Sequence, residues 1–179
     1  MEGLKNEKIT NTLKMELYTK GGSQWYCDYY FYNGISSERG TTKAGGYGYD
    51  KHSTVASNAI NKFKFLYKMK NGIKWNSIEH LTLKDGSRIY GLYKEKDISY
   101  GIGISSVLNC LKAFSNVKIK YINYGQKSDF IHLEIVTTAK QLQKEIEKQQ
   151  KIVNNKKTTK EDRRITRYTI NKIKELFNI

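Results

Sequence analysis

Proline is absent from this 179-residue chain, and only two cysteines, Cys27 and Cys110, are present. The cysteines are far apart and form no C-x-x-C pair, so neither a disulfide framework nor a zinc site is indicated. No stretch approaches the roughly 18 consecutive apolar residues of a membrane-spanning helix. Residues 1–10 are charged and lack the apolar core of an export signal, so we expect a cytoplasmic protein without membrane contact.

Acidic residues are also scarce. The chain has 17 Asp and Glu against 32 Lys and Arg, which gives a formal net charge of +15. Such a charge raises the local concentration of polyanions, so we expect a partner that carries phosphates or a protein that handles one. Positive charge is densest in residues 139–179, where twelve basic residues accompany five acids. We therefore expect a core domain, 1–138, followed by a basic helical C-terminal appendage, 139–179.

Hydrophobic periodicity indicates the fold class. Alternating apolar residues predict strands, and apolar stripes at helical spacing predict helices. The expected strands cover residues 13–19, 24–32, 39–43, 88–94, 117–124 and 130–136. The expected helices cover residues 53–69, 105–114 and 139–153, with a last helix that begins after a cap formed by Thr159 and Asp162. These elements suit an α+β fold with a mainly antiparallel sheet, helices packed on one face and a C-terminal helical pair.

The richest aromatic segment is Trp-Tyr-Cys-Asp-Tyr-Tyr-Phe-Tyr at residues 25–32. Because side chains alternate along a strand, the odd-numbered residues share one side, and their apolar character predicts that this side faces the core. The even-numbered Tyr26, Tyr30 and Tyr32 then share the other side, and tyrosines on an open sheet face can stack nucleic-acid bases. The alternative is that a helix covers this side as well and packs the tyrosines.

A glycine turn, Gly-Gly-Tyr-Gly at residues 45–48, precedes the helix expected from residue 53. Backbone N–H groups at a helix start attract anions. However, the segment lacks both the G-K-[ST] ending of a phosphate-binding P-loop and complete G-x-G-x-x-G spacing. Asp50 adds a negative charge where a phosphate would lie, so a purely structural turn is the alternative.

Candidate catalytic groups are few. His52, His80 and His132 are scattered, and neither a metalloprotease H-E-x-x-H motif nor a zinc-deaminase motif is present. The carboxylates between residues 85 and 97 are not clustered as a metal-dependent nuclease requires. We therefore predict that the chain is not an enzyme and uses neither a metal nor a cofactor.

Two segments carry a resemblance: WYCDYYFYN at residues 25–33 and TTKAGGYGYDKHSTVASNAI at residues 41–60. They resemble small proteins of phages and other mobile elements of low-GC bacteria, a group that includes a type II anti-CRISPR family. The likeness covers roughly residues 13–68, about a third of the chain. It implies a non-enzymatic inhibitor in the host-cell cytoplasm that binds a guide-loaded type II CRISPR effector nuclease and blocks target DNA engagement. Many such inhibitors are acidic DNA mimics, whereas this chain is basic.

The basic charge suggests that an inhibitor of this kind would contact guide RNA, target DNA or an acidic protein patch. The candidates for stacking bases are Tyr26, Tyr30 and Tyr32. The candidates for phosphate contacts are Lys43, Lys64, Lys68, Arg163, Arg164 and Arg167. The second hypothesis is a general nucleic-acid-binding accessory protein of a phage or mobile element, which would bind DNA or RNA directly. A third is an unrecognised nuclease.

Overall fold

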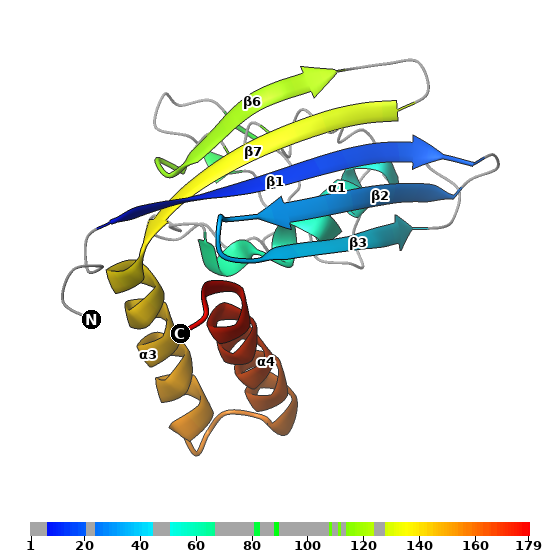
Figure 1. The fold of residues 1–179 in the computed structure, drawn as a ribbon. Coiled ribbons are helices and arrows are strands. Elements are labelled where there is room, and N and C mark those ends of the chain that lie inside the picture. The colour runs from blue at the N-terminus through cyan, green and yellow to red at the C-terminus, as the bar shows by residue number, and fades with distance from the viewer. Residues whose placement is uncertain are drawn as a thin grey trace.

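The computed structural model describes residues 7–20, 24–44, 51–66, 81–82, 88–89, 108, 111, 114–123 and 128–179. Its main feature is a five-stranded antiparallel sheet with the strand order β3-β2-β1-β7-β6 (Figure 1). The five strands are β1 (Lys8–Thr19), β2 (Trp25–Tyr32), β3 (Ser37–Ala44), β6 (Val117–Asn123) and β7 (Ser128–Thr138). A short separate pair consists of β4 (Leu81–Thr82) and β5 (Arg88–Ile89).

The helices fall into two groups. Helix α1 (Lys51–Asn61) and the 3-10 helix η1 (Lys64–Leu66) lie against one face of the sheet (Figure 1). Helices α3 (Ala139–Asn154) and α4 (Lys160–Phe177) form a hairpin at one end of the sheet. This arrangement confirms the predicted α+β class, with an antiparallel sheet and a C-terminal helical pair. None of the described helices combines the length and the apolar character needed to cross a membrane.

Strand β1 is central because it pairs with β2 along one edge and with β7 along the other. Its Leu13, Met15 and Leu17 are at most 2% exposed, whereas its even-numbered residues are half-buried or exposed. Since side chains alternate across a strand, this period of two gives the sheet one apolar side and one solvent-facing side. The same alternation continues in β2, where Cys27 and Phe31 are fully buried.

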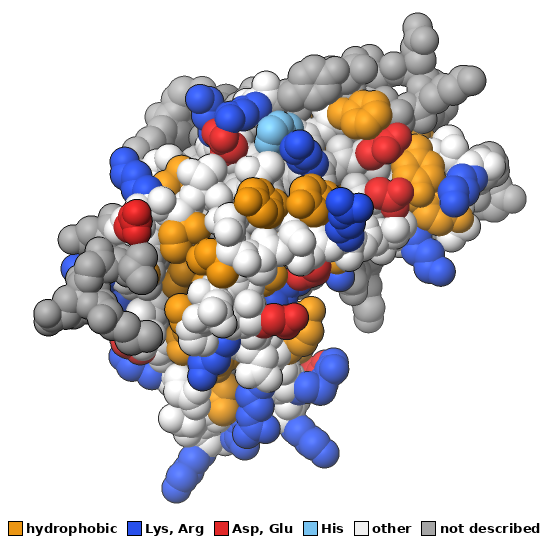
Figure 2. Space-filling model, viewed as in Figure 1, with side chains coloured by type: hydrophobic (Ala, Val, Ile, Leu, Met, Phe, Trp, Pro, Cys, Tyr) orange, Lys and Arg blue, Asp and Glu red, His pale blue; other side chains and the backbone are white. Residues whose placement is uncertain are grey.

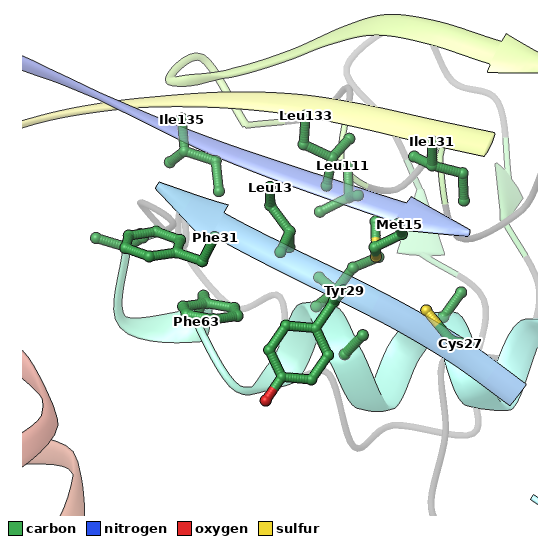
Figure 3. Packing of buried hydrophobic residues seen from close by; sticks show 14 of the residues in the cluster. Leu13, Met15, Cys27, Tyr29, Phe31, Phe63, Leu111, Ile131, Leu133 and Ile135 are labelled. Atoms are coloured by element: carbon green, nitrogen blue, oxygen red, sulfur yellow. The ribbon is translucent and has the colours of Figure 1, made fainter. Parts of the chain in front are cut away.

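The apolar side of the sheet faces α1 across a core that contains packed aromatic rings (Figure 3). Phe31 and Phe63 stack with ring centroids 4.6 Å apart, and Tyr29 meets Phe63 edge-on at 5.8 Å. Such ring pairs add roughly 0.5–1.5 kcal/mol to the stabilisation that burial alone provides. Gly40 in β3 makes room for Tyr29, because a Cβ at this position would lie 2.5 Å from the Tyr29 hydroxyl oxygen.

The helix predicted over residues 53–69 is shorter and begins earlier in the structure. Helix α1 ends at Asn61, and the chain then winds more tightly into η1. The N–H of Phe63 donates to the carbonyl of Ile60, and the N–H of Leu66 donates to the carbonyl of Phe63. These i→i−3 bonds turn the chain further per residue than an α-helix would, and both Phe63 and Leu66 are buried.

Other predicted boundaries differ by a few residues. Strands β1, β3 and β7 extend beyond the ranges expected from alternation alone. Of the strand predicted over 88–94, residues 88 and 89 form β5, and the remainder lies outside the described residues. Within the helix predicted over 105–114, Leu108, Leu111 and Phe114 are described, and all three are buried.

The helical hairpin begins where β7 ends, at the boundary expected after residue 138. Thr138 forms a capping box: its side chain accepts from the N–H of Gln141, and the Gln141 side chain accepts from the N–H of Thr138. Thr159 caps α4 as predicted, because its hydroxyl oxygen accepts from the N–H of Asp162 at 3.1 Å. These contacts satisfy N–H groups that have no partner within the first helical turn.

A buried ion pair attaches α4 to the sheet. Lys172 is 6% exposed, and its ammonium nitrogen lies 2.9 Å from Oε1 of Glu38 in β3. The same carboxylate oxygen accepts from the Tyr29 hydroxyl at 3.0 Å. The ammonium also lies 4.6 Å from the centre of the Phe63 ring. A charge removed from water needs such partners, because its desolvation costs several kcal/mol.

The turn between β2 and β3 holds the C-terminal end of α4. Asn33 Nδ2 and Ser36 Oγ each donate to the carbonyl of Leu176 at 2.8 Å. Carbonyls in the last helical turn have no partner within the helix, so these two bonds satisfy an acceptor that would otherwise be orphaned. The hairpin and the sheet also share one core cluster, to which the hairpin contributes Leu142, Ile173, Leu176 and Phe177.

Replacement of Glu38 by glutamine should lower the free energy of unfolding by about 2–4 kcal/mol, because the Lys172 ammonium then stays buried without a counter-charge. The matched control is Glu161→Gln, which breaks an exposed ion pair with Arg164 and should have little effect. Urea denaturation followed by circular dichroism measures both variants. If both variants changed the free energy of unfolding equally, the buried pair would not stabilise the docking of α4.

Candidate nucleic-acid interface

The side of the sheet opposite α1 is here called the open face. Within the described ranges no helix lies over it (Figure 1). Figure 2 looks onto this face and shows basic, acidic and hydrophobic side chains intermixed over the strands. The charged and aromatic side chains of the open face are Lys14, Glu16, Tyr18, Tyr26, Asp28, Tyr30, Tyr32, Arg39, Lys43, Lys118, Phe130, His132 and Glu134, with Lys20 and Lys120 beside them. Therefore none of the described helices covers the tyrosines of β2 (Figure 1), which was the alternative left open by the sequence.

A stacked tyrosine pair forms the first aromatic unit of the open face. Tyr18 and Tyr26 are directly opposite each other in β1 and β2, with ring centroids 5.5 Å apart and planes inclined by 15°. The ammonium of Lys20 lies 5.8 and 5.3 Å from the two ring centres. Lys43, directly opposite Tyr26 in β3, is exposed. Rings with neighbouring cations can bind a base together with its phosphate.

Tyr30 and Arg39 form the second aromatic unit. They are directly opposite each other in β2 and β3, and the guanidinium carbon lies 4.7 Å from the centre of the tyrosine ring. On the other side of Tyr30, β1 contributes the exposed Lys14, and β7 contributes His132 opposite Lys14. Tyr32, two residues further along β2, is 48% exposed.

Two carboxylates lie between the aromatic units. Glu16 and Asp28 are directly opposite each other in β1 and β2. Asp28 accepts from the Thr41 hydroxyl at 2.6 Å and from the Tyr18 hydroxyl at 3.1 Å. Desolvation and this hydrogen bond to Asp28 raise the pKa of Tyr18, so the tyrosine remains a neutral donor.

The β7 side of the open face carries one paired acid and a neutral histidine. Glu134 forms an ion pair with Lys120 of β6, and the hydrogen bond from Lys120 lowers the pKa of Glu134. The pKa of His132 is lowered by desolvation and by the nearby Lys14 and Lys120. At pH 7 the imidazole is therefore mainly neutral and contributes hydrogen-bonding groups rather than charge.

The structure gathers four of the nine predicted contact residues on the open face: Tyr26, Tyr30, Tyr32 and Lys43. Lys64 is exposed in η1, on the helix-covered side of the sheet. Lys68 lies outside the described residues, as does the glycine turn at 45–48. The three arginines belong to α4, in a hairpin that extends away from the strands (Figure 1).

Two of these arginines are engaged within the hairpin itself. The guanidinium of Arg163 donates to the carbonyls of Asn155 and Lys156, each at 3.2 Å, and so closes the turn between α3 and α4. Arg164 forms a two-nitrogen contact with Glu161, at 3.0 and 2.6 Å. Arg167 is exposed, and its side chain has no hydrogen bond or ion pair to the residues that the structure describes.

Sequence reasoning missed several open-face residues, among them Lys14, Lys20, Arg39 and Phe130. Arg39 was assigned to a strand, but its position opposite Tyr30 depends on the register between β2 and β3. Lys14 precedes the buried Met15, so the alternation of β1 could have indicated that it points outward. A phenylalanine is usually expected in the core, yet the Phe130 ring is exposed. Only the pairing of β7 with β1 assigns it to the open face.

Groups suited to covalent or metal chemistry are scarce in the described part of the chain. The pKa of the Cys27 thiol is raised to about 12 by burial, so this thiol is not poised as a nucleophile. Within the described ranges no three His, Cys, Asp or Glu side chains converge as a metal site requires. The described side chains of the open face are suited to stacking, hydrogen bonding and electrostatic attraction.

Comparisons with protein-family models, with curated proteins and with solved structures found no match for this chain.

Replacement of Arg163 by alanine should lower the free energy of unfolding by about 1–2 kcal/mol, because two backbone carbonyls lose a charged donor. The control is Arg167→Ala on the same helix. The Arg167 side chain is exposed and makes no hydrogen bond to the described residues, so its removal should leave stability nearly unchanged. Thermal unfolding and oligonucleotide binding are measured on both variants. If Arg163→Ala weakened binding without any loss of stability, its assigned role in closing the turn would be wrong.

Proposed function

We propose that this chain is a non-enzymatic protein that binds single-stranded nucleic acid on the open face of its sheet. The observation that carries the proposal is the combination of aromatic rings with cations on one uncovered surface. Tyr18 and Tyr26 lie beside Lys20, and Tyr30 lies beneath Arg39. Aromatic rings and basic groups that share one sheet face are a common basis for binding single strands.

The aromatic rings of the open face favour a single strand over a duplex. Bases in a duplex are stacked on one another, so their faces are not available to protein rings. In a single strand each base can turn onto a tyrosine, which contributes about 1–3 kcal/mol per base. Tyr26 and Tyr30 are four residues apart in β2, which is about 13 Å at the usual strand rise. Two bases of one strand that are not adjacent can therefore occupy the two aromatic units, with the intervening part of the strand between them.

The cations around the rings suit the phosphates of the same strand. Lys20 and Lys43 flank the first aromatic unit, and Lys14 and Arg39 flank the second. Binding that uses about four phosphate contacts should give a slope of roughly −3 for log affinity against log salt.

The more specific proposal is an anti-CRISPR-type inhibitor that binds a guide-loaded type II effector nuclease and blocks target DNA engagement. It rests on the resemblance of residues 25–33 and 41–60 to mobile-element proteins. One feature of the structure supports it: most of the first segment forms β2, whose tyrosines lie on the open face. The second segment begins in β3 and ends in α1. An effector displays guide RNA and displaced DNA as single strands, which the open face could contact through its rings and cations.

Replacement of both Tyr26 and Tyr30 by alanine should weaken binding to a short single-stranded RNA or DNA by a factor of at least about 10, because two stacking contacts are lost. Fluorescence anisotropy at two or more salt concentrations measures the affinity and its salt slope. The control is Tyr168→Ala on α4, which removes a tyrosine that is 63% exposed and lies outside the open face. If the double variant and the control bind alike, the open face is not the binding site.

In a target-cleavage assay with a guide-loaded type II effector, inhibition should saturate near one molar equivalent of the chain, because the proposed mechanism is binding. The Tyr26→Ala/Tyr30→Ala variant should inhibit less, and Tyr168→Ala should inhibit normally. Complete inhibition at far below one equivalent would contradict a binding mechanism. Retained oligonucleotide binding without inhibition would favour the general accessory protein.

A further inference from the structure

Glu16 stands out among the acids of the open face, because Asp28 and Glu134 each have a described donor and Glu16 has none. It is half-buried, with Asp28 directly opposite on β2 and Phe130 directly opposite on β7. Like charges directly opposite one another in an antiparallel pair are destabilising. Asp28 is compensated by Thr41 and Tyr18, whereas no described side chain donates to the Glu16 carboxylate. Glu16 therefore keeps acceptor capacity for a bound molecule.

The position of Glu16 restricts which part of a nucleotide can approach it. A phosphate would be repelled, because Glu16 and Asp28 place two negative charges at this point. A base can approach, since Phe130 provides a ring that is 40% exposed beside the carboxylate. Stacking on that ring and hydrogen bonding to the carboxylate are compatible roles for two adjacent side chains.

The chemistry of a carboxylate selects among the bases. An ionised carboxylate has two acceptor oxygens and no donor. Guanine presents two adjacent donors, N1–H and the N2 amino group, so both oxygens can accept. On the same edge of adenine, cytosine or uracil each donor has an acceptor beside it, which would oppose the second oxygen. Guanine is therefore the base whose Watson–Crick edge matches this group.

We infer that Glu16 is a specificity-determining residue, which gives the open face a preference for guanine in single-stranded nucleic acid. The inference rests on the proposed function, because it requires a strand bound to the open face. Glu16 contacts the base edge, and the neighbouring rings and cations supply affinity that does not depend on sequence. The expected preference is on the order of tenfold for one guanine, as for other two-bond base contacts.

The test uses fluorescently labelled oligouridine with one central guanosine, adenosine, cytidine or inosine. The wild-type chain should bind the guanosine oligonucleotide about tenfold more tightly than the adenosine or cytidine ones. Inosine lacks the N2 amino group, so it should lose most of this preference. Glu16→Gln keeps the size of the side chain but replaces one acceptor by a donor, so it should abolish the guanine preference while binding to the other oligonucleotides stays equal or improves.

The matched control is Glu147→Gln, which makes the same change of charge on the exposed surface of α3. It should retain the guanine preference of the wild-type chain. Binding without a guanine preference, or with a preference that Glu16→Gln leaves intact, would overturn the role of Glu16 but not the proposed function. Absence of binding to any of the oligonucleotides would overturn both.

Discussion

The register of β1 between β2 and β7 is the constraint on which the rest of the structure depends. A slip of one residue would exchange the buried and outward side chains of the whole strand. Each of Leu13, Met15 and Leu17 contributes about 1.5–3 kcal/mol by burial, so the core resists such a slip strongly. The opposition of Glu16 to Asp28 costs only about 0.2–1 kcal/mol. Core burial therefore dominates, and it fixes which outward residues become neighbours.

A second constraint fixes the helical hairpin. The C-terminal half of α4 is anchored by the Lys172–Glu38 ion pair and by the β2–β3 turn, which donates to Leu176. The basic residues near the turn of the hairpin lie at the other end of the helices (Figure 1). Among the residues that the structure describes, the cations of the open face and those near the turn of the hairpin therefore lie on separate surfaces. The sequence had led us to predict the tyrosines and the arginines together as candidate contacts.

The sequence predicted the fold class because alternation and helical spacing are local properties that survive in the folded chain. It also predicted that Tyr26, Tyr30 and Tyr32 share one side of β2, which follows from a period of two, but it left open whether a helix covers that side. It could not predict the partners of these rings, because the register that sets Arg39 opposite Tyr30 depends on long-range pairing. The sequence also could not predict the role of Arg163, because its contacts with the carbonyls of Asn155 and Lys156 depend on the conformation of the turn.

The separation of the two basic surfaces bears on how each would act on a polyanion. Exposed charges are screened by salt over about 8–10 Å, so the cations near the turn of the hairpin, at the end of the helices away from the strands (Figure 1), contribute little to a contact made on the strands. Arg163 and Arg164 are further reduced in effect because they already bind carbonyls and a carboxylate of the hairpin. The exposed Lys156, Lys157 and Arg167 still add to the long-range field that speeds encounter. Affinity and base selection should therefore reside in the open face, and the hairpin should act mainly on the rate of association.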